Sequence, residues 1–96
     1  MSHHEEGHDR NRPVAVAVIT PSGTFPNDYD YRRAFSHERV EEVLKLAKAH
    51  LELTDTTDWE ATVDNQPIDP QKAFEDIGLE QIVEIRWNMK EGGGGA

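Results

Sequence analysis

The chain has 96 residues, of which 19 are acidic and 10 basic, and its formal net charge is −9. A chain of this size forms one domain, which buries about 60–65% of its unfolded surface, and it leaves no room for a separate catalytic domain. The negative charge repels nucleic acid and anionic membranes, so we expect neither as a partner and favour a basic protein. The absence of cysteine excludes a disulfide framework, a thiolate nucleophile and a cysteine-ligated zinc site.

The N-terminal segment, residues 1–12, is polar and charged without periodicity, which predicts a disordered arm. Three of its histidines are candidate metal ligands, but a solvated tail or an expression remnant explains them better, so we expect no metal site. They are His3, His4 and His8. The sequence shows neither a signal peptide nor a run of about 20 apolar residues. We therefore expect a cytoplasmic protein.

A hairpin is expected first. Residues 13–20 form an apolar, β-branched run that ends at turn residues 21–23, which predicts a buried strand and a turn. Residues 24–35 are expected to form the second strand, and Pro26 places it at an edge of the sheet. The alternation predicts acids on one face of this strand and aromatics on the other. The acids are Asp28 and Asp30, and the aromatics are Tyr29 and Tyr31.

One amphipathic helix is expected next. Ser36 is a residue type preferred at a helix N-cap, and apolar residues follow it at helical spacing. These are Val40, Val43, Leu44, Ala47 and Leu51. The pattern predicts a helix that reaches about Leu53, with its apolar stripe on the sheet and the pair Glu41 and Lys45 on the wet face.

Two further strands are expected around an irregular crossing. Residues 59–63 alternate as a short strand, and Asp64 and Asn65 suit a tight reversal. Ile68, between two prolines, is expected to plug the core. Gly78 is expected to close a short helical or irregular turn at positive φ.

The closing strand is expected over residues 81–89, where apolar and polar side chains alternate. The apolar set is Val83, Ile85 and Trp87, and the polar set is Glu84, Arg86 and Asn88. A tail, residues 90–96, follows directly and contains four consecutive glycines. We expect this tail to be flexible.

This order of elements predicts an α+β fold, a β-β-α-β-β mixed sheet packed on one helix, over residues 13–89. The helix is expected to cover Val14, Val16, Val18, Val83 and Ile85. Because one helix covers only one face of a sheet, the other face meets water or a partner. That face is expected to carry Ala15, Ala17, Ile19, Glu84 and Arg86.

The order also resembles ubiquitin and its β-grasp relatives. The segment "VITPSGTF" is similar to the first β-turn of that family, and "WEATVDNQPIDPQKAFEDIGLEQIVEIRW" resembles its second half. The resemblance covers Val14 to the C-terminus and depends on the order of elements, since no single motif is diagnostic. The divergence is most similar to the ubiquitin-like modifiers of bacterial conjugation operons.

The resemblance implies a protein modifier that forms isopeptide bonds. In conjugated relatives an activating enzyme uses ATP to adenylate a terminal glycine, and a conjugating enzyme transfers that glycine to a lysine of a target protein. Here Gly95 would be the reactive terminus and Gly92, Gly93 and Gly94 the recognised tail, whose lack of Cβ suits a narrow channel. Ala96 departs from the pattern, so a JAB-type peptidase is expected to cut between Gly95 and Ala96, with Gly93 or Gly94 as alternative termini.

The resemblance further implies a recognition face and acceptor sites. Relatives use an apolar patch on the exposed sheet face, where this chain offers Glu84 and Arg86, with Ala17 and Ile19 as a smaller apolar spot. Proteins that bind ubiquitin are therefore expected to bind it poorly. The chain is expected to bind no cofactor and to be a monomer when free. Candidate self-linkage sites are Lys45, Lys48, Lys72 and Lys90.

Two alternatives remain open. One is a β-grasp sulfur carrier with a C-terminal thiocarboxylate, and the other is a non-covalent ubiquitin-like interaction domain whose glycine run is a linker or a cloning remnant. An enzyme is not expected, because His37 and His50 have no plausible nucleophile beside them. The adjacent Glu75 and Asp76 would point in different directions, so they indicate no acid–base pair.

Overall fold

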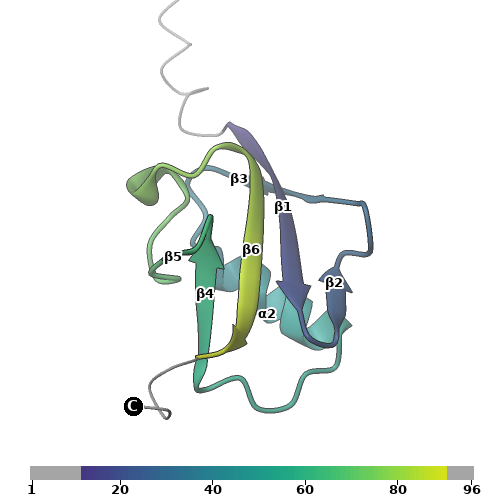
Figure 1. The fold of residues 1–96 in the computed structure, drawn as a ribbon. Coiled ribbons are helices and arrows are strands. Elements are labelled where there is room, and N and C mark those ends of the chain that lie inside the picture. Colours follow the sequence, from purple (N-terminus) through teal and green to yellow (C-terminus); the bar gives the residue numbers. More distant parts are fainter. Residues whose placement is uncertain (1–11, 91–96) are drawn as a thin grey trace, which may run out of the picture.

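The computed structural model describes residues 12–90, which form one mixed sheet and one helix (Figure 1). The elements in chain order are β1 (Pro13–Thr20), β2 (Gly23–Phe25), β3 (Arg32–Phe35), α2 (Val40–His50), β4 (Trp59–Val63), β5 (Gln66–Pro67), the 3-10 helix η2 (Glu75–Ile77) and β6 (Gln81–Met89). The predicted α+β fold is confirmed. Apart from Arg12 and Lys90, the predicted arm and tail lie outside the described residues.

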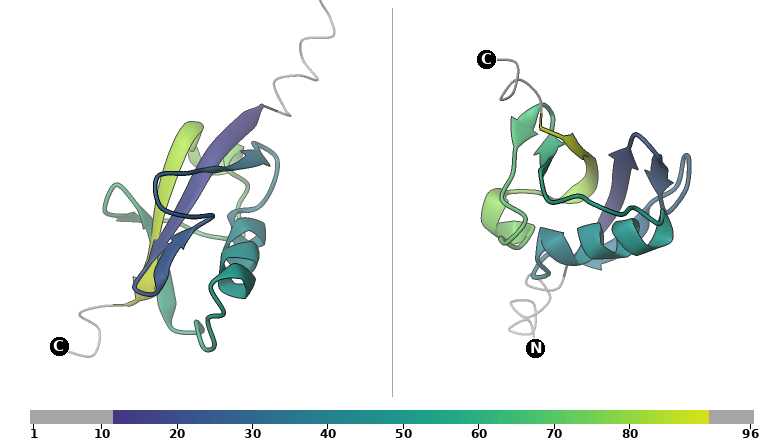
Figure 2. Two further views of the ribbon diagram at one scale, coloured as in Figure 1. Left: turned by 90° about the vertical axis from the view of Figure 1, so that its right-hand side faces the viewer. Right: turned by 90° about the horizontal axis from the view of Figure 1, so that it is seen from below.

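The sheet has the strand order β2-β1-β6-β4-β5, and β3 also pairs with β1. The central strands β1 and β6 are parallel, and every other pairing is antiparallel. Parallel neighbours need a crossover connection, and α2 lies in that connection. Figure 2 shows the helix packed along one face of the sheet, which leaves the opposite face uncovered.

The core lies between α2 and the inward side chains of the strands. From Val14 to Val18 on β1 and from Val83 to Trp87 on β6, every second side chain is buried, with at most 7% of its surface exposed. These side chains are Val14, Val16, Val18, Val83, Ile85 and Trp87. They form one cluster with Val40, Val43, Leu44 and Ala47 of the helix, as predicted, and Ile68 packs against it.

The prediction of a continuous second strand is wrong. A loop, residues 26–31, splits it into β2 and β3, which pair with different parts of β1. Turn hydrogen bonds replace the ladder there: the Asp30 N–H donates to the Asn27 carbonyl at 3.2 Å, and the Asp30 carboxylate accepts the next backbone N–H at 2.8 Å. Asp28 and Tyr29 therefore do not alternate across a strand.

The helix also begins later than predicted, at Val40 instead of directly after Ser36. The intervening residues form a separate turn. The Glu38 N–H donates to the Phe35 carbonyl at 2.9 Å, and the Glu38 carboxylate accepts the Phe35 N–H at 2.8 Å. This closed turn takes the place of the predicted N-cap.

The helix ends at His50, three residues before the predicted end. Glu52 adopts a left-handed conformation with φ 56, and the Leu53 N–H donates back to the Lys48 carbonyl at 2.9 Å. This pattern is a Schellman motif, which normally uses glycine at the left-handed position. No glycine stands at this position to indicate the helix end.

The predictions for the second half of the chain are confirmed. Asp64 and Asn65 both have positive φ, 53 and 67, as a two-residue type I′ reversal between β4 and β5 requires. Gly78 closes η2 at φ 72. Within residues 12–90, no helix has the length and apolar character needed to cross a membrane.

Candidate functional site

The end of β6 is the point from which the predicted conjugation tail departs. β6 pairs with β4 as far as Met89, which lies opposite Trp59. The Lys90 N–H then donates to the Asp58 carbonyl at 3.2 Å. The chain is thus held by backbone hydrogen bonds up to its last described residue. The predicted tail and cleavage residues lie outside the described part of the chain: Gly92, Gly93, Gly94, Gly95 and Ala96.

The four predicted contact residues lie together on the sheet face that α2 leaves uncovered. Ala17 of β1 lies opposite Glu84 of β6, and Ile19 lies opposite Arg86. Glu84 and Arg86 are exposed and Ile19 is half-buried. Ala17 is only 5% exposed, so it can offer a partner little surface.

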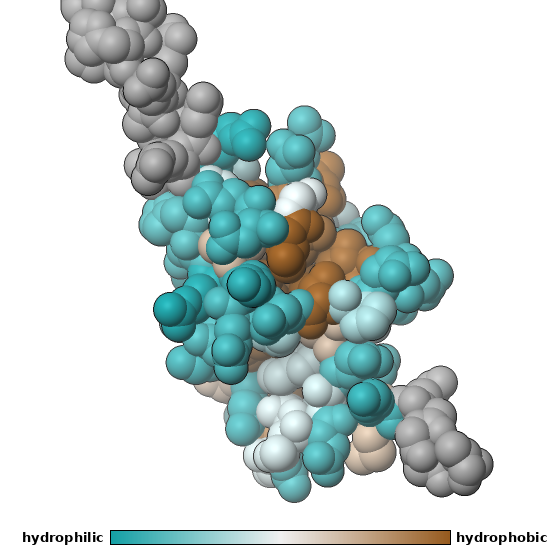
Figure 3. All heavy atoms as spheres, turned by 90° about the vertical axis from the view of Figure 1, so that its left-hand side faces the viewer, coloured by the Kyte–Doolittle hydropathy of each residue, from teal (hydrophilic) through white to brown (hydrophobic). Residues whose placement is uncertain are grey.

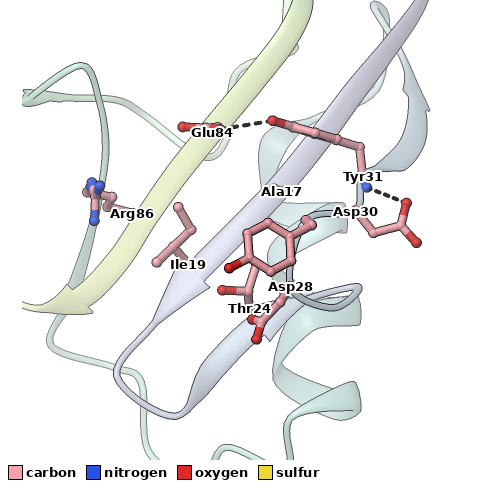
Figure 4. Close-up of a pocket in the computed structure, with 9 residues that line it drawn as sticks. Ala17, Ile19, Thr24, Asp28, Asp30, Tyr31, Glu84 and Arg86 are labelled. Carbon is pink, nitrogen blue, oxygen red and sulfur yellow. Dashed lines mark hydrogen bonds between the residues drawn. The ribbon is translucent and has the colours of Figure 1, made fainter.

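A depression of about 430 Å³ lies over this face, next to the loop that interrupts the second strand (Figure 4). We call it the loop hollow. Its lining consists of Ala17, Ile19, Thr24, Asp28, Tyr29, Asp30, Tyr31, Glu84 and Arg86. The loop supplies four of these nine residues, and they were predicted to lie on a strand instead.

A hydrogen bond ties the loop to the far central strand. Tyr31 extends across β1, and its hydroxyl donates to the Glu84 carboxylate at 2.9 Å (Figure 4). This bond raises the pKa of Tyr31 above its ordinary value, and the negative charge of Glu84 and slight desolvation act in the same direction. This pair was not predicted from the sequence. The turn residues that follow Pro26 were the signal that the chain leaves the strand before Tyr31.

The charged groups around the loop hollow differ in whether they have hydrogen-bond or ion-pair partners. Asp30 accepts hydrogen bonds from its own loop, from the Asn27 side chain at 3.4 Å and from the Tyr31 N–H at 2.8 Å. Asp28 has no hydrogen-bond or ion-pair partner within residues 12–90. The guanidinium of Arg86 lies on the far side of β6 from Asp28 (Figure 4). The loop side of the hollow is therefore acidic.

The candidate acceptor lysines lie in different settings. Lys45 forms an ion pair with Glu42 at 3.7 Å. Lys48 is half-buried on α2, whereas Lys72 and Lys90 are exposed. These settings do not rank the four as acceptors.

The histidines of the described chain contact aromatic rings. His37 stacks on Phe35 with ring centroids 6.2 Å apart, and the rings of His50 and Phe25 form a T-shaped pair with centroids 5.2 Å apart. No group of three or more residues capable of holding a metal ion occurs within residues 12–90.

Apolar side chains also gather on another side of the molecule, the side of β4, β5 and η2 (Figure 3). These elements and the residues beside them contribute Val63, Ile68, Ile77 and Leu79, which are half-buried and pack against the core. They form the margin of the core where the helix no longer covers it.

Comparisons with known proteins support the fold. No family model matches the chain, and no curated protein matches it in sequence. Ubiquitin from Caldiarchaeum subterraneum has a similar structure, with a TM-score of 0.63 at 10% identity over 86% of this chain and 100% of that chain. The ubiquitin-like domain of an Arabidopsis thaliana protein gives 0.59 at 21% identity over 84% and 81%. A protein designed on the basis of ubiquitin gives 0.63 at 13% identity over 88% and 96%.

Proposed function

We propose that this ubiquitin-like chain is a protein modifier, joined through the carboxylate of a tail glycine to amino groups of target proteins. One observation carries the proposal: β6, a central strand of a ubiquitin-like sheet, stays paired as far as Met89, and the glycine run begins three residues later, at Gly92. An enzyme that holds the folded domain would therefore find the tail at a fixed point of departure. Glycine suits such a tail because it meets little steric resistance in a narrow channel.

The proposed maturation is a hydrolysis. A peptidase of the JAB type adds water across the bond between Gly95 and Ala96 and leaves a free carboxylate on Gly95, or on Gly93 or Gly94 if it cuts earlier. An activating enzyme then adenylates this carboxylate with ATP and releases pyrophosphate. Thioester formation on an enzyme cysteine releases AMP, and a target lysine displaces that thiol to form the isopeptide bond. We place these partners in a bacterial conjugation operon, following the resemblance in sequence.

The test is a reconstitution read by intact mass. The full chain is incubated with ATP and the candidate peptidase, activating enzyme and conjugating enzyme. The proposal predicts loss of Ala96 and then a covalent adduct on a target protein. Gly95→Val should abolish the adduct that forms through Gly95, whereas Gly7→Val, the same change outside the tail, should not.

Other outcomes identify the alternatives. Replacement of one carboxylate oxygen by sulfur, without transfer to lysine, would indicate a sulfur carrier. An unchanged mass in the presence of active enzymes would indicate a non-covalent ubiquitin-like domain. Either outcome contradicts the proposal.

A further inference from the structure

We propose that the loop hollow binds an arginine side chain presented by a basic segment of a partner protein. This site goes beyond conjugation, because it lies on the folded domain and involves no residue of the tail. Its occupant follows from three properties of the hollow: its size, its aromatic side chains and its charge.

The hollow has a floor, a wall and an exposed aromatic ring. Ile19, which is half-buried, gives an apolar floor that can contact the methylene stem of a long side chain, and the buried Ala17 lies beside it. Tyr31 forms a wall that its hydrogen bond to Glu84 holds in place at 2.9 Å. Tyr29, by contrast, is 101% exposed, so its ring is free to stack on a ligand. A volume of about 430 Å³ is ample for one side chain.

Charge determines which side chain fits. Three carboxylates line the hollow, those of Asp28, Asp30 and Glu84. Asp28 is unpaired within residues 12–90, and the guanidinium of Arg86 lies on the opposite side of β6 (Figure 4). The hollow therefore has acceptors for a cation and no competing cation on its loop side. The net charge of −9 over the whole chain attracts a basic segment from a distance.

Among cations, arginine matches this lining better than lysine. Its planar guanidinium can stack on a tyrosine ring and direct a fork of N–H donors at a carboxylate in the same pose. Tyr29 and Asp28 are adjacent in the loop, so one guanidinium can reach both. A lysine ammonium has no flat face for stacking and is more strongly hydrated.

The experiment is a titration of the full, isotope-labelled chain, followed by amide chemical shifts. The probe is Nα-acetyl-arginine amide. Its matched controls are Nα-acetyl-citrulline amide, which keeps the shape without the charge, and Nα-acetyl-lysine amide. We expect saturable shifts at Ala17, Ile19 and Tyr31 with the arginine probe only. A lack of shifts there would overturn the proposal, and so would equal shifts with citrulline, lysine or calcium chloride.

Variants locate the contacts. Asp28→Asn and Tyr29→Ala should each weaken binding by about two- to fivefold, the range expected for an exposed charge or cation–π contact. Both residues are exposed, so these variants should fold. Asp64→Asn is the matched control, since it removes one charge at the remote reversal and should leave the affinity unchanged. Equal affinity of Asp28→Asn and the unaltered chain would refute the assigned site.

The outcome is separable from that of the proposed function. The titration needs neither ATP nor any enzyme, so a failed titration leaves conjugation untouched. Conversely, a chain that forms no adduct could still bind the arginine probe.

Discussion

Replacing Phe74 by alanine should remove a large part of the stability of the domain. Phe74 is fully buried, at 0% exposure, in the cluster shared by the helix and the sheet. Its backbone holds it there, because its N–H donates to the Glu38 carbonyl at 3.1 Å and its carbonyl accepts the Leu79 N–H at 2.9 Å. The segment cannot easily collapse into the space that the ring leaves, so the loss of contacts is added to a cavity.

The magnitude follows from typical values. Truncation of a buried phenylalanine to alanine costs about 3–5 kcal/mol. At about 0.05–0.15 kcal/mol per residue, the 79 described residues are expected to have a free energy of unfolding of about 4–12 kcal/mol. With a urea dependence of about 1–3 kcal/mol per molar, Phe74→Ala should lower the unfolding midpoint by at least about 1 M.

The assay is urea unfolding, monitored by tryptophan fluorescence. Trp87 belongs to the core cluster and Trp59 packs against it, with their ring centroids 5.4 Å apart, so unfolding changes the surroundings of both. Leu46→Ala is the control, since Leu46 is a 43% exposed helix residue. It should change the free energy of unfolding by less than about 0.5 kcal/mol. If Phe74→Ala cost no more than this control, the segment before η2 would not belong to the core and the reasoning would be refuted.

Three further predictions concern single positions. Gly78→Ala should lower the free energy of unfolding by about 1–2 kcal/mol in the same assay. Beyond Gly78 and its two chain neighbours, no atom lies within 4 Å of an added Cβ, so only the φ of 72 opposes the change. An unchanged midpoint would contradict this. Asn65→Gly should raise the free energy of unfolding slightly, by less than about 1 kcal/mol, because glycine adopts φ 67 more readily than asparagine; a loss of stability would contradict it. Glu84→Gln should lower the pKa of Tyr31, measured by ultraviolet absorbance in a Tyr29→Phe background, since Glu84 now raises it. Because the folded state binds this proton more tightly, its stabilising contribution is present below the ordinary tyrosine pKa, about 10, and is lost as pH rises through the raised value; a pKa that does not change would argue against the hydrogen bond.

Periodicity predicted the parts of the fold that tertiary packing reinforces. In β6 the alternation of apolar and polar side chains is matched by burial from Val83 to Trp87, so both strand and face were predicted correctly. The reversal at Asp64 and Asn65 and the turn at Gly78 were predicted because their residue types tolerate positive φ. In these places local and tertiary preferences agree.

The predictions failed where local hydrogen bonds competed with a weak pattern. Asp30 closes a turn that breaks the alternation on which the second strand was predicted. Glu38 closes another turn that delays the helix, and Glu52 takes a left-handed conformation that favours glycine. The loop hollow was not predicted because of the first of these errors. The hollow exists because residues 26–31 leave the strand.

The measurement that tests the modifier proposal most directly is the identification of branched peptides. Trypsin cleaves after Lys90, so a target lysine that has received the chain through Gly95 would carry the remnant Glu91 to Gly95. The chain, tagged at its N-terminus, is purified from host cells together with its adducts, digested and analysed by tandem mass spectrometry. The proposal predicts target lysines that carry this remnant, or a shorter one that ends at Gly93 or Gly94. Recovery of the tail only as a linear peptide, in cells that contain the activating and conjugating enzymes, would contradict it.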